Sequence, residues 1–448
     1  MKNIIYILGL VVVSMFVTSC EENLTEFNTD PNNPTDVDVN LILPQAVTQA
    51  AFNEGLNPNR VAGIIMQQFR GLEAQQAEYT DYVIKADAMN NYWNTALYSG
   101  VLRSCNNIIN KATERPFYSG VAKIIMANEL GKATSYFGDI PYSQAFLGTD
   151  NLKPAYDSQE SIYSTVQTLL SEGISEVTGG GYFGGDLVYG GDATSWVKLA
   201  HGLKARYYMH TGERLGTYGD ALAEAGMSFA SNAEAGGFQF QSSEVANWSL
   251  AKFAIERPAT LGITDQFAEM MTGDPRFSKY IAGDAGSYTF FDAADGELTW
   301  GRSDARVPLM SFVEVEFIKA EAKQRAGMDA TADLASGIAA SMELSGATDD
   351  GYVEAASADG SLENIMTEAY KAYYGFNFHE TWANWRRTGF PTLAPNPAPA
   401  ASNGFNPSGV IPRRYLYTQD ERQTNRESVE AAESAQGGDL LDVGLWAF

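Results

Sequence analysis

Hydrophobic positions recur along most of the chain with the spacing of amphipathic helices. Apolar residues repeat every three or four positions, in segments separated by short breaks rich in glycine and proline. Helices are predicted over the ranges 61–69, 91–109, 121–137, 162–177, 221–230, 334–344 and 362–378. Two more are predicted to start at helix-start signals, one at Asp192 (or Thr194) and one at Pro308. The pattern therefore predicts an all-α fold.

The predicted helices come in pairs joined by short breaks. Such pairing is typical of helical hairpins of the tetratricopeptide kind, but no strict repeat of about 34 residues is present. We therefore expect an irregular helical bundle that contains tetratricopeptide-like hairpins, not a regular solenoid.

Two aromatic clusters are interpreted as structural. Trp93 shares a predicted helix face with Leu97 and Val101, which favours a core position over a ligand contact. The segment with Trp382 and Arg386 predicts a guanidinium group stacked on an indole ring, again as packing and not as ligand binding.

The range 236–301 breaks the helical pattern. Aromatic and threonine-rich runs at 287–291 and 297–300 flank the pair Asp295-Gly296, which favours a β-hairpin turn. A minor β-hairpin or loop insertion near 236–301 is therefore predicted on an otherwise helical body. Loops held on a rigid scaffold are common places for binding residues.

The N-terminus has a pattern of its own. Lys2 precedes an apolar run, Ile4–Val17, which is too short to span a bilayer and ends in small residues before Cys20. This order is typical of a secretory signal, and it resembles a bacterial lipoprotein signal. The resemblance implies that residues 1–19 are removed and that Cys20 is lipidated. An ordinary signal peptide with an incidental cysteine is the alternative.

A polar tether at 20–40 follows, and 41–448 is expected to form a single domain. The tether is dense in Asp, Asn and Pro between 28 and 34. Calcium binding there is disfavoured, because the alternating ligand spacing and central glycine of a helix-loop-helix calcium site are absent. Glu21-Glu22 resembles the acidic tag that directs lipoproteins to the outer face of the outer membrane.

Composition narrows the range of partners. The formal net charge is −25 and 45% of residues are hydrophobic, so the chain can bury a large core and repels phosphate backbones. Nucleic acid is therefore not expected as a partner. Strongly anionic ligands are also disfavoured, unless a local basic patch overrides the net charge. Cys20 and Cys105 are the two cysteines of the sequence, so lipidation of Cys20 would leave no intrachain disulfide.

Catalytic and metal motifs are missing from the sequence. His201 and His210 lie nine positions apart and fall on opposite helix faces, and His379 is remote from both, so a histidine zinc site is not expected. No nucleophile elbow, H-E-x-x-H motif or phosphate-binding glycine loop occurs. We therefore predict no cofactor, no metal and no enzymatic activity.

Four segments carry a resemblance to a known family. They are Ser-Tyr-Phe-Gly-Asp-Ile-Pro-Tyr at 135–142, Phe-Ile-Lys-Ala-Glu-Ala at 317–322, Trp-Ala-Asn-Trp-Arg-Arg-Thr-Gly-Phe-Pro at 382–391, and Ile-Pro-Arg-Arg at 411–414 followed by Asn425. In this order, and behind the lipoprotein-like start, they resemble the SusD/RagB-like family of Bacteroidetes. The segments are expected to serve the fold or docking to a partner, and not ligand contact.

The resemblance implies a lipid-anchored protein of the cell surface at the outer membrane. It implies an α-helical fold that caps a SusC-like, TonB-dependent outer-membrane transporter and captures oligosaccharide or polysaccharide for import. The alternatives are a peptide-binding import component of the same family, a surface glycoside hydrolase, and a lid of the transporter that binds no small ligand.

Glycan capture requires flat apolar faces for sugar rings and polar groups for hydroxyls. Aromatic residues outside the helical stripes are therefore the predicted ligand-binding residues, although each could instead anchor a loop. They are Phe69, Tyr79, Tyr82, Trp248, Phe291 and Trp300.

Overall fold

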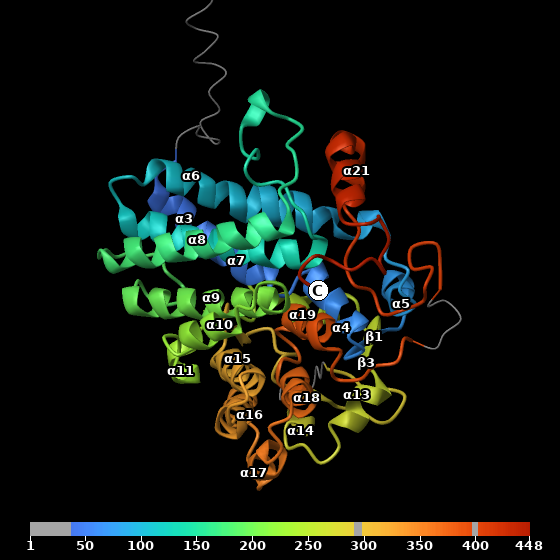
Figure 1. The fold of residues 1–448 in the computed structure, drawn as a ribbon. Helices are drawn as coiled ribbons and strands as arrows, with labels where there is room; N and C mark the ends of the chain where they lie inside the picture. Colours follow the sequence, from blue (N-terminus) through green and yellow to red (C-terminus); the bar gives the residue numbers. More distant parts are fainter. Residues whose placement is uncertain (1–36, 291–297, 397–401) are drawn as a thin grey trace, which may run out of the picture.

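The protein is a layered helical body in a computed structural model that describes residues 37–290, 298–396 and 402–448 (Figure 1). The helices of the first half are α3 (Val39–Asn53), α4 (Asn57–Ile65), α5 (Ala74–Thr80), η1 (Ala86–Met89), η2 (Tyr92–Leu102), α6 (Arg103–Lys111), α7 (Pro116–Phe137), η3 (Gly148–Asp150), α8 (Gln159–Thr178), α9 (Ala193–Leu215) and α10 (Tyr218–Ala225). Those of the second half are α11 (Asn232–Ala235), α12 (Ser249–Glu256), α13 (Asp265–Met270), α14 (Phe277–Tyr280), α15 (Phe312–Arg325), α16 (Thr331–Ser345), α17 (Tyr352–Ser357), α18 (Leu362–Ala372), α19 (Phe378–Thr388), α20 (Gln419–Thr424) and α21 (Arg426–Ala435).

The long helices pack as successive hairpins. Figure 1 shows α6, α7, α8 and α9 side by side, with α10 and α15 below them and α16 beyond. A large core runs through these layers, and a smaller core fills the space between α15, α16 and α18. The predicted α-rich fold with helical hairpins is confirmed.

Local sequence explains several helix ends. Asp192 caps α9, because its Oδ2 accepts the Ser195 backbone N–H at 2.9 Å. Ser311 caps α15 in the same way, because its Oγ accepts the Glu314 backbone N–H, so that helix begins at Phe312, four residues after the predicted Pro308. The last residues of the chain dock on the body, where the Ala447 N–H donates to Gln159 Oε1 at 2.9 Å.

Several predicted helices differ from the observed ones. The helix predicted at 61–69 is α4, which ends at Ile65, and Phe69 lies in a short strand. The helix predicted at 221–230 is α10, which ends at Ala225. The range 91–109 is a π-helix, η2, that continues into α6. The range 362–378 is split into α18 and α19 by a turn at Gly375, which has a left-handed φ of 91°. A Cβ at Gly375 would lie 2.2 Å from the ring of Trp300, so packing of this tryptophan requires glycine and ends the helix there.

Short strands form two antiparallel pairs. β1 (Phe69–Gly71) pairs with β3 (Leu261–Ile263), and β2 (Phe238–Gln239) pairs with β4 (Arg306–Val307). The two flanks of the predicted hairpin, 287–291 and 297–300, pair with other residues where the structure describes them. Thr289 bridges to Ala282, and the Thr299 N–H donates to Lys279 O. The predicted turn Asp295-Gly296 lies outside the described residues.

Within residues 37–290, 298–396 and 402–448, no helix combines the length and the apolar character required to cross a bilayer.

Candidate functional site

The predicted ligand-binding aromatics lie in the core. Phe69, Tyr79, Tyr82, Trp248 and Trp300 are each 3% exposed or less. They pack against other rings, as Trp300 does against Phe376 at a centroid distance of 4.6 Å. A ring without an open face cannot stack on a sugar, so in this conformation these five side chains serve packing. Phe291 lies outside the described residues.

The family-like segment at 382–391 also belongs to the interior. Arg386 lies over the Trp382 ring at 4.3 Å and over the Phe448 ring at 4.0 Å, which confirms the predicted stacking and fastens the C-terminus. Its guanidinium also donates to the Ser135 backbone oxygen at 2.6 Å. Two of the four quoted segments therefore meet in one structural contact.

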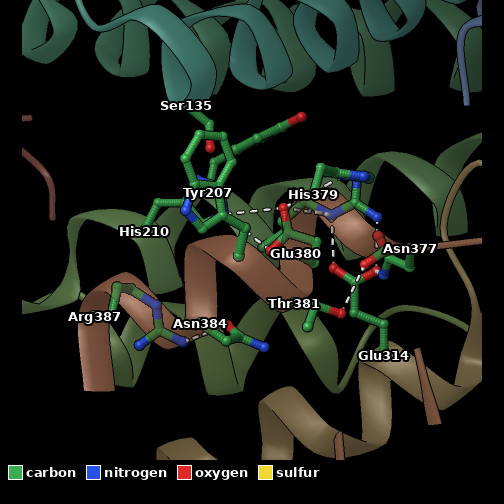
Figure 2. A network of polar contacts seen from close by, with 12 residues as sticks. Ser135, Tyr207, His210, Glu314, Asn377, His379, Glu380, Thr381, Asn384 and Arg387 are labelled. Carbon is green, nitrogen blue, oxygen red and sulfur yellow. Dashed lines mark hydrogen bonds and ion pairs between the residues drawn. The ribbon is translucent and has the colours of Figure 1, made fainter. Parts of the chain in front are cut away.

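A buried polar network surrounds this contact (Figure 2). Arg206 pairs with Glu314, and His210 Nε2 lies 3.0 Å from both carboxylate oxygens of Glu380. Tyr163 OH lies 2.9 Å from His210 Nδ1, so a neutral imidazole that accepts at Nδ1 and donates at Nε2 satisfies both contacts. The network joins α8, α9, α15 and α19.

The network lacks the features of a reaction site. Burial lowers the pKa of His210, and the neighbouring His210 and Arg206 hold the pKa of Glu380 below its usual range despite burial. The cavity beside Arg206 and Glu380 measures only about 10 Å³, too little for a substrate. Among the described residues, no cluster of three or more His, Cys, Asp or Glu side chains could hold a metal ion.

An open groove lies elsewhere, at the end of the body where the segment between α7 and α8 rises opposite α21 (Figure 1). We call it the amide groove. Its volume is about 650 Å³, within the range of small-molecule sites. Its lining residues are Trp93, Asn94, Tyr98, Ser99, Arg103, Asn106, Asn107, Pro141, Ala145, Phe146, Gly148, Asn151, Pro154 and Glu421.

One wall of the amide groove is a polar ladder on η2 and α6. Ser99, Arg103, Asn106 and Asn107 follow one another at helical spacing along it. None of these four side chains makes a hydrogen bond or ion pair across the groove to another described residue. η2 is a π-helix, a wider turn that occurs frequently at functional sites.

The opposite wall is apolar and comes from the segment after α7. Pro141, Ala145, Phe146 and Pro154 line it. Phe146 has a left-handed φ of 64°, which is rare for a large side chain and costs free energy. Its ring is partly exposed and lies 6.3 Å from the Tyr98 ring across the groove.

Hydrogen bonds hold the walls in place. Tyr98 OH donates to Pro141 O at 2.7 Å and joins the two walls directly. Asn94 Nδ2 donates to Asp420 Oδ2 and joins η2 to α20. Tyr156 OH donates to Glu421 Oε2 at 2.8 Å. Burial raises the pKa of Tyr156 and of Tyr98, so both hydroxyls stay protonated donors at neutral pH.

The groove is suited to binding a polyhydroxylated ring. A flat apolar face at Phe146 opposes amide and guanidinium donors, which is the pairing of surfaces that a sugar presents. It offers no nucleophile with an adjacent base. The only carboxylate among its lining residues, Glu421, already accepts from Tyr156 and Asn425.

Sequence reasoning missed this groove. Trp93 was correctly interpreted as buried, and it lies 5.0 Å from the ring of Tyr98 at the base of the groove. The sequence signal for its polar wall was the series Ser99, Arg103, Asn106 and Asn107, which follows Trp93 at helical spacing. The apolar wall could not be inferred, because Phe146 reaches it from a turn far along the chain.

Three comparisons place the chain among known proteins. The family model SusD-like_2, described as "Starch-binding associating with outer membrane", matches residues 31–418. No curated protein matches the sequence.

Solved structures share the fold. A SusD/RagB family protein from Bacteroides thetaiotaomicron VPI-5482 has a TM-score of 0.76 at 23% identity, over 92% of this chain and 99% of that one. A chitin-binding protein has a TM-score of 0.74 at 24% identity, over 92% and 99%. A chitin-binding SusD homolog from Flavobacterium johnsoniae has a TM-score of 0.72 at 20% identity, over 90% and 98%.

At these identities the structures establish the fold, and the family match rests on the sequence itself. The match covers most of the chain, including all four segments that carried the resemblance apart from Asn425. The described role of the family is binding, in agreement with the prediction that the protein is not an enzyme. The chain belongs to the SusD-like family of starch-binding proteins that associate with the outer membrane.

Proposed function

We propose that the protein is a lipid-anchored glycan-binding protein of the cell surface, which captures an oligosaccharide or polysaccharide and delivers it to a SusC-like, TonB-dependent outer-membrane transporter. The family description supports starch-like ligands, and two structural neighbours are named for chitin binding. Both polymers are neutral and suit a chain with a net charge of −25.

The amide groove carries the proposal. Its apolar wall at Phe146 faces the same space as donors at Arg103, Asn106 and Asn107, which have no hydrogen-bond partner among the described residues. Stacking of one sugar face on the ring leaves the equatorial hydroxyls at the edge of the sugar, because their bonds lie close to the plane of the sugar ring, and donors of the polar ladder bind them there. Burial of the ring face contributes about 1.5–3 kcal/mol, and each hydrogen bond adds about 1 kcal/mol.

Calorimetric titration of residues 21–448 with a panel of oligosaccharides tests the proposal. The panel holds maltooligosaccharides, chitooligosaccharides, β-glucan oligomers and fructans. We expect at least one to bind, and the double variant Asn106→Ala/Asn107→Ala to weaken that binding about tenfold or more. The exposed pair Gln241→Ala/Ser242→Ala, which does not line the amide groove, is the matched control.

Three results would count against the assignment. Unchanged affinity of the double variant would show that the amide groove does not bind the oligosaccharide. Binding of peptides in place of every glycan would favour the peptide-binding alternative. Shortened oligosaccharides after incubation would instead indicate a hydrolase.

Lipidation and delivery require separate experiments. Cys20→Ala is expected to release the protein from the outer-membrane fraction, and mass spectrometry of the unchanged protein should find acyl chains on Cys20. Retention of the variant in the membrane would contradict the anchor. Delivery predicts that a TonB-dependent barrel co-purifies with the protein and that uptake of the bound glycan requires both.

A further inference from the structure

A second groove lies away from the amide groove. It has a volume of about 850 Å³ and lies between the β2–β4 pair, the segment at 299–306 and the C-terminal end of α16. We call it the basic groove, after Lys279, Arg302 and Arg306 in its lining. It shares no lining residue with the amide groove.

The charges of the basic groove are only partly balanced. Arg302 is paired with Asp304, at 2.9 Å from Nε to Oδ1. Glu343 is the other carboxylate in the lining, and its Oε2 already accepts from Asn232 Nδ2 at 2.8 Å. Neither Lys279 nor Arg306 forms an ion pair with any carboxylate of the described residues.

Arg306 is oriented by its surroundings. Its Nε donates to the Gly237 backbone oxygen at 3.3 Å, which leaves the terminal nitrogens of the guanidinium without a partner among described residues. Trp300 also lines the groove, and its buried Nε1 has no hydrogen-bond partner. The lining of the groove therefore carries three cationic side chains against the two carboxylates of Asp304 and Glu343.

We propose that the basic groove is a second binding site, and that its ligand is a uronic acid unit of an acidic saccharide. The sugar carboxylate pairs with the Lys279 ammonium and the Arg306 guanidinium, through charge-assisted hydrogen bonds. Ring hydroxyls contact Gln239 and Thr299 at the edges of the groove. The site extends the ligands of this chain from neutral to acidic sugars.

The net charge of the chain does not prevent such binding. At physiological ionic strength the Debye length is about 8 Å, so acidic groups elsewhere on the surface are largely screened. A carboxylate in contact with two cations is screened much less, because the contact pairs exclude solvent. Local charge therefore decides the sign of the interaction in the groove.

The test uses calorimetric titration of residues 21–448 with oligomers of galacturonate and of mannuronate. The unchanged protein is expected to bind at least one, and Lys279→Gln/Arg306→Gln to weaken this binding at least tenfold. Lys85→Gln/Arg426→Gln removes the same charge from exposed residues that line neither groove, and it should change the affinity less than twofold. The methyl ester of the bound oligomer keeps the ring, loses the charge and should bind at least tenfold more weakly.

Several outcomes of this titration would overturn the proposal. They include no binding of either uronate, equal binding of the ester, and equal loss of affinity in the control variant. Asp292, Asp295 and Glu297 precede the groove in sequence, outside the described residues. Uronate binding that occurs only in Asp292→Asn/Asp295→Asn/Glu297→Gln would also overturn the proposal. It would mean that Lys279 and Arg306 pair with these carboxylates in the unchanged protein.

The result is separable from the neutral-glycan proposal. The Lys279→Gln/Arg306→Gln variant should bind neutral oligosaccharide as the unchanged protein does, and Asn106→Ala/Asn107→Ala should bind uronate normally. Displacement of uronate by saturating neutral glycan would place both ligands in one groove and reject a second site.

Discussion

Arg206 and Glu314 form a two-pronged ion pair in the centre of the protein, with 2.6 Å from Nε to Oε1 and 2.7 Å from Nη2 to Oε2. Each side chain is 2% exposed. The pair joins α9 to α15, and Asn377 Nδ2 donates to the same carboxylate at 2.8 Å. It connects the hairpin layers of the first half of the chain to the helices of the second half.

Removal of one member of this pair should be strongly destabilising. Arg206→Met leaves the Glu314 carboxylate buried without its counter-charge, and we expect a loss of about 3–5 kcal/mol in the free energy of unfolding. Urea denaturation followed by circular dichroism measures the change. Arg302→Gln, which breaks an exposed pair with Asp304, should cost less than about 1 kcal/mol. Equal effects of the two variants would show that the buried pair has no special weight.

The ring of Phe146 should be separable from the fold. Phe146→Gly removes the stacking face and also relieves the left-handed backbone, so stability should be kept while glycan affinity falls about tenfold to hundredfold. Melting temperature and calorimetric titration report the two quantities. Leu147→Ala, a change at the exposed apolar neighbour, should leave affinity unchanged. A Phe146→Gly variant that still binds with full affinity would remove this ring from the site.

Sequence periodicity predicted the helices well because each stripe buries one face in the same core. It placed Trp93 correctly and predicted that Arg386 stacks on Trp382. It could not locate the strands, since β1 pairs with a segment nearly two hundred residues away, at Phe69 opposite Ile263. Pairing at such separation leaves no local signal.

The location of the candidate binding site was harder to predict from the sequence, for a related reason. Aromatics outside the stripes were expected to be exposed, yet a loop that crosses a helical body uses large rings to fasten itself to the core. Trp248 packs on Phe240 in this way, at a centroid distance of 5.2 Å. The amide groove instead combines η2, a turn after α7 and α20, which only the folded chain brings together.

The buried tryptophans offer a direct check on their assignment. Trp248→Ala should lower the free energy of unfolding by about 3–5 kcal/mol, because the indole is fully buried, and Trp300→Ala should act similarly. The milder double variant Trp248→Phe/Trp300→Phe should fold and should bind oligosaccharide with unchanged affinity. Circular dichroism confirms that this variant is folded. Loss of affinity in the folded variant would show that the two indole rings contribute to ligand binding.

His379 should make the protein sensitive to mild acid. Burial holds its pKa well below the usual value, and the positive charges of Arg206 and Lys132 act in the same direction, against the opposing effect of Glu380. Neither ring nitrogen makes a hydrogen bond to a described residue, and Nε2 lies 3.6 Å from Glu380 Oε1. The native state therefore keeps this imidazole neutral at pH values where the unfolded chain protonates it.

The sign of the effect follows from the lowered pKa. Below the pKa of about 6.5 that the imidazole has in the unfolded chain, the unfolded state binds a proton and the native state does not. The free energy of unfolding therefore falls as pH falls. The slope approaches about 1.4 kcal/mol per pH unit for each such histidine, and His210, whose pKa is also lowered, contributes in the same direction. Stability is retained in full above about pH 7.

His379→Phe isolates this contribution. The variant keeps a ring beside Tyr136 and removes the buried polar nitrogens, so stability at pH 7.5 should stay within about 1.5 kcal/mol of the unchanged protein. Below about pH 6.5, the slope of unfolding free energy against pH should become smaller, and the contribution of His210 should remain. Urea titrations at intervals across this window measure both slopes. A slope unaltered by the substitution, or an imidazole signal of His379 that titrates near pH 6.5 in the folded protein, would show that the ring is accessible to protons and that its burial does not control acid stability.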